Sequence, residues 1–248
     1  ASLIFESCKA FFRWAKADAY ITANPATAIR VEVGKTSKRK APTRRPFTPE
    51  ELKVLFEAPN FTGFKSPSRR FEPGSLVVRN AYYWVPLIGL YTGMRLGEII
   101  QLHMSDLHLD GLHPYIDVSE DTDPKADAAD AKHVKSDAGI RRVPVHPDLI
   151  KLGFREFVRG RQKDRRTRTR LFWEVGYGAD GQPSSIFSKW FGRLLGKAGL
   201  TDPALVFHSF RHGMEDAFRN ALTPQYVIDR IIGHADGAVS SQYGQGGS

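Results

Sequence analysis

The sequence of 248 residues contains one cysteine, Cys8, and three methionines. A single cysteine allows no disulfide within the chain and no cysteine-based zinc site, which excludes the disulfide-rich secreted classes. Long apolar runs are also missing, and 25% of the residues are charged, so no segment has the composition of a membrane span. Residues 1–13 include Glu6 and have no apolar signal core. We therefore expect a protein that stays in the reducing cytoplasm.

Acidic residues are in the minority, because 27 Asp and Glu stand against 36 Lys and Arg and give a formal net charge of +9 at pH 7. This surplus favours a polyanionic partner, most simply nucleic acid, although many basic proteins bind none. Hydrophobic residues make up 41% of the chain and aromatic residues 11%. That content excludes a disordered chain and suffices for one large core or two small ones.

The composition divides the chain into three stretches. Residues 1–30 hold apolar side chains at helical spacing, and since one helix cannot bury such a stripe alone, we expect the end of a helical domain. Residues 31–46 are basic and contain two prolines, which predicts an extended linker, either a solvated tether or a strap on phosphates. A second domain over 47–248 begins with Thr48 and Glu51, the pattern of a capping box.

This second domain is predicted to be mainly α with a small antiparallel β-sheet (α+β). Apolar periodicity predicts helices over 76–91, 148–162, 184–198, 208–221 and 224–232. Residues 59–74 are predicted to form a loop, and the acidic, alanine-rich segment 121–130 a mobile excursion. Apolar alternation predicts three short strands from Leu107, Leu109, Tyr115, Ile116, Val118, Ile140, Val143 and Val145.

Single polar residues in this domain have ordinary structural explanations. Arg95, between two glycines, fits a helix cap, and His234 after Gly233 fits a helix end. His208 and Arg211 are three apart and share one helical face. The partners expected to neutralise this arginine are Glu98, Asp216 or a phosphate. Tyr243, taken alone, is an ordinary core or surface tyrosine.

The order of the polar residues is more specific than any one of them. Arg95 lies in TGMRLGEI (92–99), His208 and Arg211 lie in HSFRH (208–212), and His234 follows Ile-Gly at 232–233. Together with Lys135 and Tyr243, these motifs resemble the tyrosine recombinase, or phage-type integrase, family. The resemblance covers Thr48 to Tyr243 and implies that family's catalytic-domain fold. Residues 1–30 look like the tail of its helical core-binding domain, 31–46 its interdomain linker and 47–248 its catalytic domain.

The resemblance implies a role for each residue of the set. Arg95 and Arg211 would clamp the non-bridging oxygens of a DNA phosphodiester, because guanidinium forks bind them and stay charged. His208 and His234 would add hydrogen bonds, and His208 would help to deprotonate the nucleophile, Tyr243.

Lys135 would be the general acid, with Lys132 as the alternative. Glu98 and His212 are supporting candidates. The basic run 159–170 is either a solvated loop or a set of backbone phosphate contacts.

The implied activity is cleavage and rejoining of DNA strands through a covalent 3′-phosphotyrosine, with no metal, ATP or other cofactor. Expected partners are double-stranded DNA and further recombinase protomers in a tetrameric synapse, and no membrane partner is expected. The expected location is the cytoplasm, at the nucleoid. Two alternatives stay open: a type IB topoisomerase-like enzyme, and a DNA-binding module with reduced turnover. In the family, a whole core-binding domain and a segment after the tyrosine hold the synapse together, and here they would be reduced to residues 1–30 and to five residues after Tyr243. The expectation for this chain alone is therefore weak, salt-sensitive DNA binding and slow cleavage, without complete strand exchange.

Overall fold

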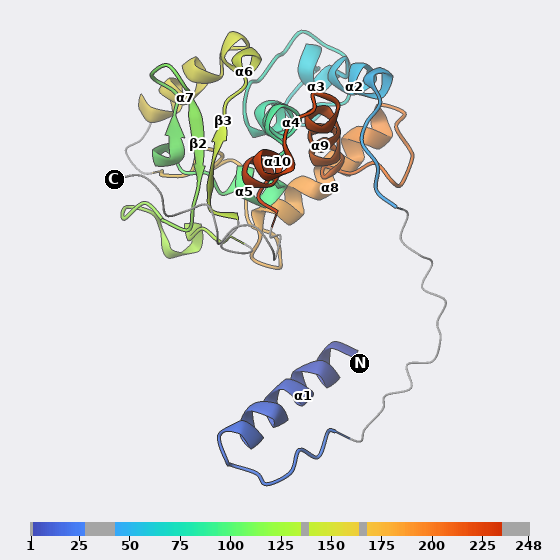
Figure 1. Cartoon of the computed structure of the whole chain (residues 1–248). Helices are drawn as coiled ribbons and strands as arrows, with labels where there is room; N and C mark the ends of the chain where they lie inside the picture. Colours follow the sequence, from blue (N-terminus) through green and yellow to red (C-terminus); the bar gives the residue numbers. More distant parts are fainter. Residues whose placement is uncertain (1, 28–42, 135–138, 164–167, 235–248) are drawn as a thin grey trace. The chain divides into compact units, whose positions relative to one another are not determined.

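The structure is a computed structural model that describes residues 2–27, 43–134, 139–163 and 168–234. The chain divides into two compact units, Ala1–Pro42 and Thr43–Ser248, and each is described by itself (Figure 1). In the first unit, α1 (Ser2–Ala17) confirms the helix predicted at the start of the chain. Its aromatic rings contact one another, with Trp14 5.7 Å from Phe11 and 5.4 Å from Tyr20 between ring centroids.

The second unit is mainly helical with one small sheet, as predicted (Figure 1). Strand β2 (Tyr115–Val118) pairs antiparallel with both β1 (Leu107–His108) and β3 (Arg141–Pro144), so the order is β1-β2-β3. Ile116 lies opposite Leu107 on one side and Val143 on the other. The helices are α2 (Pro49–Phe56), α3 (Pro59–Thr62), α4 (Ala81–Thr92), α5 (Leu96–Ile100), α6 (Pro147–Lys151), α7 (Phe154–Lys163), α8 (Pro183–Lys197), α9 (Ser209–Asn220) and α10 (Gln225–Ile232), with 3-10 turns η1 (Met104–Asp106) and η2 (Ala128–Asp130).

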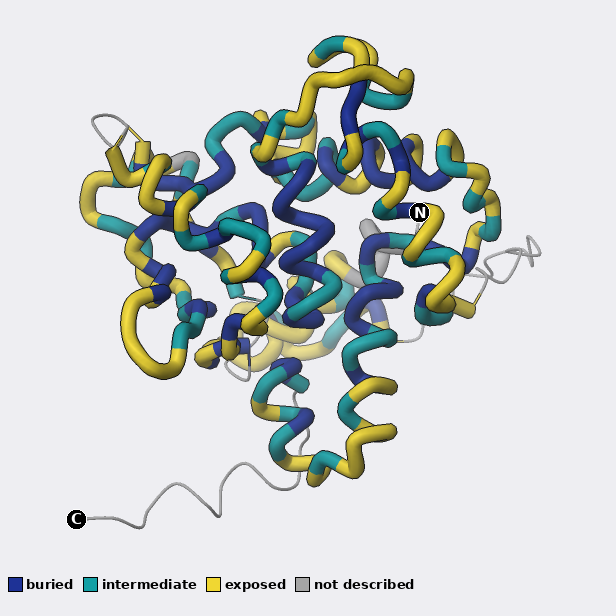
Figure 2. The backbone as a smooth tube through the Cα atoms, turned by 90° about the horizontal axis from the view of Figure 1, so that it is seen from above, coloured by how far each residue is buried: buried dark blue, intermediate teal, exposed yellow. Residues whose placement is uncertain are grey.

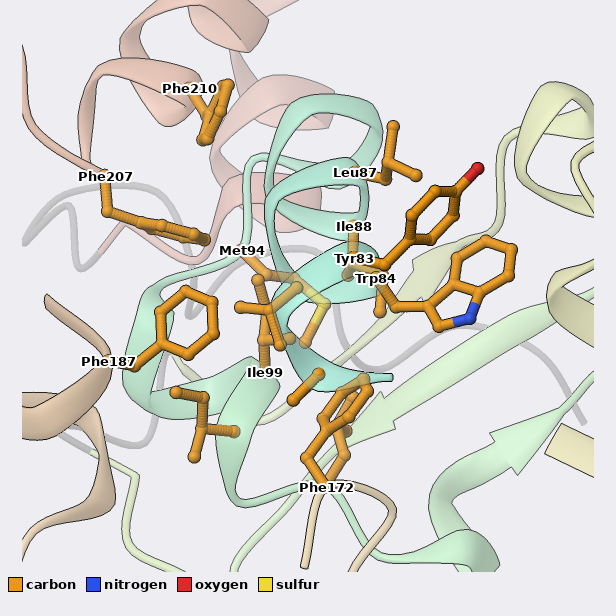
Figure 3. Close-up of a cluster of buried hydrophobic side chains, with 14 of the residues drawn as sticks. Tyr83, Trp84, Leu87, Ile88, Met94, Ile99, Phe172, Phe187, Phe207 and Phe210 are labelled. Carbon is orange, nitrogen blue, oxygen red and sulfur yellow. The ribbon is translucent and has the colours of Figure 1, made fainter. Parts of the chain in front are cut away.

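Helix α4 forms the centre of the core, because most of its residues are buried and it packs against α5 and α9. Figure 2 shows the buried tube concentrated in the interior of this unit. Asn80 begins the helix, since its side chain accepts a hydrogen bond from the Tyr82 amide, and left-handed Gly93 ends it. In Figure 3 side chains of α4 lie among residues from other segments, including Met94, Ile99, Phe172, Phe187, Phe207 and Phe210.

Several boundaries differ from the predictions. The helix predicted over 76–91 begins at Ala81, and the preceding Leu76 pairs with Phe64 in a β-bridge. Gly153, at φ +95°, divides the helix predicted over 148–162 into α6 and α7. Ile140, one of the residues from which the third strand was predicted, lies just before β3 and is exposed. The strand begins at Arg141, which is buried.

Two predicted loops hold more structure than expected. Residues 59–74 contain α3, and the segment 121–130 contains η2. The buried His103 ring ties that segment down, because Nδ1 accepts from the Asp123 amide and Nε2 lies 3.1 Å from the Asp130 carbonyl oxygen. The capping box is confirmed, with Thr48 Oγ1 accepting from the Glu51 amide at 3.2 Å. Over the described ranges, none of the helices combines the length and the apolar character that a bilayer span needs.

Candidate active site

The turn between α4 and α5 positions Arg95. Gly93 ends α4 in the left-handed region at φ +64°, and the chain reverses so that Arg95 becomes the N-cap of α5. Its Nη1 donates to Glu98 Oε1 at 2.7 Å, and its Nη2 donates to the Gly233 carbonyl at 2.9 Å. The side chain keeps 28% of its surface exposed, so this cation is fixed and still reachable from solvent.

Arg211, in the first turn of α9, is almost completely buried. Its Nη1 donates to the carbonyls of Gly93 (3.3 Å) and Ile232 (2.5 Å), and its Nε lies 3.5 Å from Glu215 Oε1. Nη2 is buried without a hydrogen-bond partner among the described residues. Burial, followed by the charge of Arg95, lowers the pKa of Arg211 to about 10. The guanidinium therefore stays charged at neutral pH with one donor group unused.

His208 is the residue that precedes α9, and its ring lies 4.9 Å from the His212 ring. Burial lowers the pKa of His208 to about 4, and the charges of His212 and Arg211 act in the same direction. The imidazole is therefore neutral at pH 7 and able to accept a proton. His212 thus lies beside His208 and is half-buried like it, and its supporting role stays a prediction.

His234 follows left-handed Gly233, where α10 ends at φ +75°. Its Nε2 lies 3.1 Å from Glu215 Oε1 and its Nδ1 lies 3.5 Å from Asp229 Oδ1. About a third of the side chain is exposed. The ring is thus held between two carboxylates at the edge of the site.

Arg141 was not predicted as a site residue, yet it lies at the centre of the site. Its Nη2 donates to Glu98 Oε2 at 2.9 Å and its Nε donates to the Ile231 carbonyl at 2.7 Å. Burial opposes ionisation of Glu98, but hydrogen bonds and charge from Arg141, with help from Arg95, hold the pKa of Glu98 below its usual value. An arginine at an inward strand position, where an apolar residue belongs, is the sequence signal for this pair.

Glu215 is a second site residue that was not predicted. It pairs with Arg211, whereas Glu98, one predicted partner, pairs with Arg95 and Arg141. Asp216, the other predicted partner, forms a 3.0 Å pair with Arg219. The spacing of four residues between Arg211 and Glu215 on one helix is the sequence signal from which this contact could have been predicted.

Of the two lysines predicted as the general acid, the structure describes only Lys132. Lys132 is buried, and its Nζ donates to Asp106 Oδ1 at 2.8 Å and to Ser119 Oγ at 3.1 Å. Lys135 lies outside the described residues, and so does Tyr243. The roles predicted for Lys135 and Tyr243 therefore stay predictions.

Three arginines of the basic run 159–170 have acidic partners within the chain. Arg161 donates to Glu174 at 2.5 Å, and its guanidinium lies 3.9 Å from the Trp173 ring centre. Arg159 pairs with Asp110, and Arg170 is buried and donates to the Val175 carbonyl. Arg161 and Arg170 thus support packing, whereas the pair of Arg159 with Asp110 is exposed. Residues 164–167 lie outside the described ranges.

The three arginines converge on the end of α10. Arg141, Arg211 and Arg95 donate in turn to the carbonyls of Ile231, Ile232 and Gly233, three consecutive residues. His234 comes directly after them. The fold therefore gathers three guanidiniums and an imidazole around one helix end, with Glu98 and Glu215 as the carboxylates between them.

A sequence model of the phage integrase family matches residues 70–246, which is more than half of the chain. The chain belongs to the phage integrase family. A curated relative, a XerC-like tyrosine recombinase of Caldanaerobacter subterraneus subsp. tengcongensis, is 22% identical over 250 residues. The match covers 94% of this chain and 58% of the relative, so the chain spans less than two thirds of that protein's length.

Solved structures share the fold of this phage integrase family chain. The Tn1549 transposon integrase in complex with transposon right end DNA has a TM-score of 0.56 at 20% identity, covering 94% of this chain and 70% of that one. XerH recombinase bound to a palindromic difH substrate has a TM-score of 0.52 at 19% identity, covering 88% of this chain and 53% of that one. These likenesses confirm the predicted fold class.

Proposed function

We propose that this chain is the catalytic part of a site-specific DNA recombinase that cleaves and rejoins strands through a 3′-phosphotyrosine at Tyr243. Its substrate is double-stranded DNA, bound by several protomers in a tetrameric synapse in the cytoplasm, at the nucleoid. Residues 1–30 and 31–46 serve as the tail of a core-binding domain and a linker. The observation that supports this most is the convergence of Arg95, Arg211 and His234 on one helix end, with a buried donor of Arg211 unused.

This arrangement suits the transition state of phosphoryl transfer. Negative charge grows on the two non-bridging oxygens when a nucleophile attacks a phosphodiester, and fixed cationic donors stabilise that charge. Backbone carbonyls hold Arg95 and Arg211, so the guanidinium groups themselves need little movement when the phosphate arrives. Removing one such donor costs roughly 2.7–4 kcal/mol of transition-state stabilisation in other enzymes.

Proton transfers accompany the two bond changes. The neutral ring of His208 accepts the phenolic proton of Tyr243 while the tyrosine oxygen attacks phosphorus. The bond from phosphorus to the 5′-oxygen breaks, and Lys135 gives that oxygen a proton. A 5′-hydroxyl of a second strand then reverses the steps and releases the tyrosine. The scheme requires neither metal nor ATP.

Lys135 is preferred as the acid because Lys132 is buried in its pair with Asp106. The test uses DNA with sulfur in place of the bridging 5′-oxygen, since this leaving group needs no proton. Lys135→Ala should cleave ordinary DNA poorly and the sulfur substrate well, whereas Arg95→Ala should cleave neither well. Equal behaviour of these two variants would transfer the role to Lys132.

The main experiment is adduct formation on a nicked suicide substrate, read on a denaturing gel with and without EDTA. Tyr243→Phe should abolish the protein–DNA adduct while DNA affinity survives, because one oxygen is removed. Tyr226→Phe, at an exposed tyrosine of α10, is the matched control and should leave the adduct unchanged. An adduct from the Tyr243 variant would refute the assignment, and complete loss with EDTA would refute the metal-free scheme. Wild-type protein that binds DNA without an adduct would favour the binding module.

A further inference from the structure

Glu215 lies between two cations of the candidate site. Its Oε1 is 3.1 Å from His234 Nε2 and 3.5 Å from Arg211 Nε, and the residue is 7% exposed. One carboxylate oxygen thus occupies the point on which both side chains converge. We propose that Glu215 is an internal anion that holds this point in the free protein and that the DNA phosphate displaces it. The inference rests on the proposed function.

The hydrogen bonds of Arg211 show why displacement is needed. A guanidinium binds a phosphate most strongly through two parallel N–H groups on one edge. Both donors of Nη1 are directed to the carbonyls of Gly93 and Ile232, so the remaining edge is formed by Nε and Nη2. Nη2 has no partner among the described residues, whereas Nε faces Glu215. A phosphate can use this whole edge after the carboxylate has left it.

The charges around the point favour one anion at a time. Arg211 contacts this point, and the charges of Arg95 and Arg141 lie close enough to lower the pKa of Arg211. Glu98 already neutralises part of the charge of Arg95 and Arg141. A phosphate next to an ionised Glu215 places two negative groups within a few ångströms of each other, in a partly buried site where repulsion is strong.

The displaced carboxylate also has a cation to receive it. Arg219 Nη2 lies 3.6 Å from Glu215 Oε2 and is half exposed, one turn further along α9. A rotation of the glutamate side chain toward this residue moves its charge away from His234 and Arg211. Asp216 pairs with Arg219 Nη1 at 3.0 Å, whereas Glu215 faces Nη2, so the two carboxylates contact different nitrogens of this guanidinium.

The test compares two variants that remove the same charge from neighbouring residues. Glu215→Gln keeps the size and an acceptor oxygen, and Asp216→Asn changes an exposed residue of the same helix. In a Tyr243→Phe background, we expect Glu215→Gln to bind duplex DNA about tenfold more tightly, the effect of relieving one close like-charge contact. Asp216→Asn should change the affinity less than twofold.

Equal gains in both variants would show a general charge effect and overturn the proposal. Weaker binding by Glu215→Gln would show a fixed anchor of Arg211 and overturn it too. A measurement on the wild-type residue covers a variant that fails to fold: in a DNA complex the distance from Glu215 Oε1 to Arg211 Nε should exceed 4 Å, and an unchanged contact refutes displacement. Wild-type protein that binds DNA and forms the adduct, with no gain in the Gln variant, refutes this inference and leaves the proposed function standing.

Discussion

A single carboxylate, Glu98, serves two arginines from different elements. Arg95 follows α4, Arg141 lies on β3, and both donate to Glu98, which is 6% exposed. A buried ion pair adds little net stability compared with an apolar pair, but removing one partner leaves an uncompensated charge. Glu98 therefore matters to the site because it keeps two guanidiniums together at a short distance.

The first prediction follows from this pairing. Glu98→Gln should reduce the free energy of unfolding by about 3–5 kcal/mol, since two buried or half-buried guanidiniums lose their counter-charge. Urea unfolding followed by circular dichroism measures the change. Glu57→Gln, in an exposed 3.9 Å pair with Lys53, is the control and should cost about 0–1 kcal/mol. Similar losses in both variants would argue against a structural role for Glu98.

The second prediction concerns the protonation of His208. Because the folded-state pKa of about 4 lies below the ordinary histidine value, the unfolded chain takes up the proton first as the pH falls. Stability present above pH 6.5 is therefore lost progressively as the pH falls toward 4, and His208→Gln should lose less of it.

Nuclear magnetic resonance titration of the His208 ring tests the cause directly. The resonance should remain that of a neutral imidazole at pH 5.5, with the midpoint well below the ordinary histidine value. A midpoint of His208 near 6.5 would remove the support for its role as a base.

At the scale of elements, the turn between α4 and α5 depends on glycine at one position. A Cβ at Gly93 would lie 2.9 Å from Ile232 Cδ1 and 3.0 Å from Met214 Cβ, and φ is +64°. The same residue gives its carbonyl to Arg211. Gly93 thus serves three purposes. It permits the sharp turn, it allows Met214 of α9 and Ile232 of α10 to pack closely, and it helps to position Arg211.

The third prediction compares the two glycines of this turn. Gly93→Ala should cost roughly 2 kcal/mol or more, because left-handed backbone strain of about 1–2 kcal/mol adds to the close contacts, and DNA cleavage should fall with it. Gly97→Ala is the matched control within α5, with no described atom within 4 Å of the added Cβ. It should stabilise the protein by about 0.5–1 kcal/mol. Equal melting temperatures in the two variants would contradict the argument.

Sequence periodicity located the elements better than it located their ends. Apolar residues from Leu76 onward continue the pattern of α4, yet Asn80 supplies a cap and the helix begins after it. Gly153, in a left-handed conformation two residues after the end of α6, also separates α6 from α7 where the apolar periodicity continues. The sheet was predictable because alternation survives in short strands, but its inward face includes Arg141, whose partner Glu98 comes from a distant segment.

The residues of the candidate site that lie in the family's ordered motifs could be predicted from the sequence. Arg95, Arg211 and His234 were singled out by the resemblance, and the structure brings them to one helix end. Glu215 and Arg141 were missed, because a carboxylate or an arginine is common on helices and strands. The spacing of Arg211 and Glu215 indicates their pair, but the contacts of Glu215 with His234 and of Arg141 with Glu98 join distant segments.

At the scale of the whole molecule, the main core lies entirely within the second unit, from Phe47 to Phe210. The fourth prediction is that a fragment of residues 43–248 folds by itself, with a melting temperature within a few degrees of the full chain. Thermal unfolding at 222 nm compares the two. A fragment that melts more than 10 °C lower would show that residues 1–42 are part of the same cooperative unit.

The three consecutive carbonyls at the end of α10 tie ligand binding to local folding. Each accepts from one arginine of the site, so fraying of the last helical turn releases Arg141, Arg211 and Arg95 together. By thermodynamic reciprocity, a phosphate that binds the ordered arginines must protect that turn by the same free energy. The fifth prediction is slower amide hydrogen exchange at Ile232 and Gly233 when DNA is bound, a measure of occupancy that needs no strand to be cut.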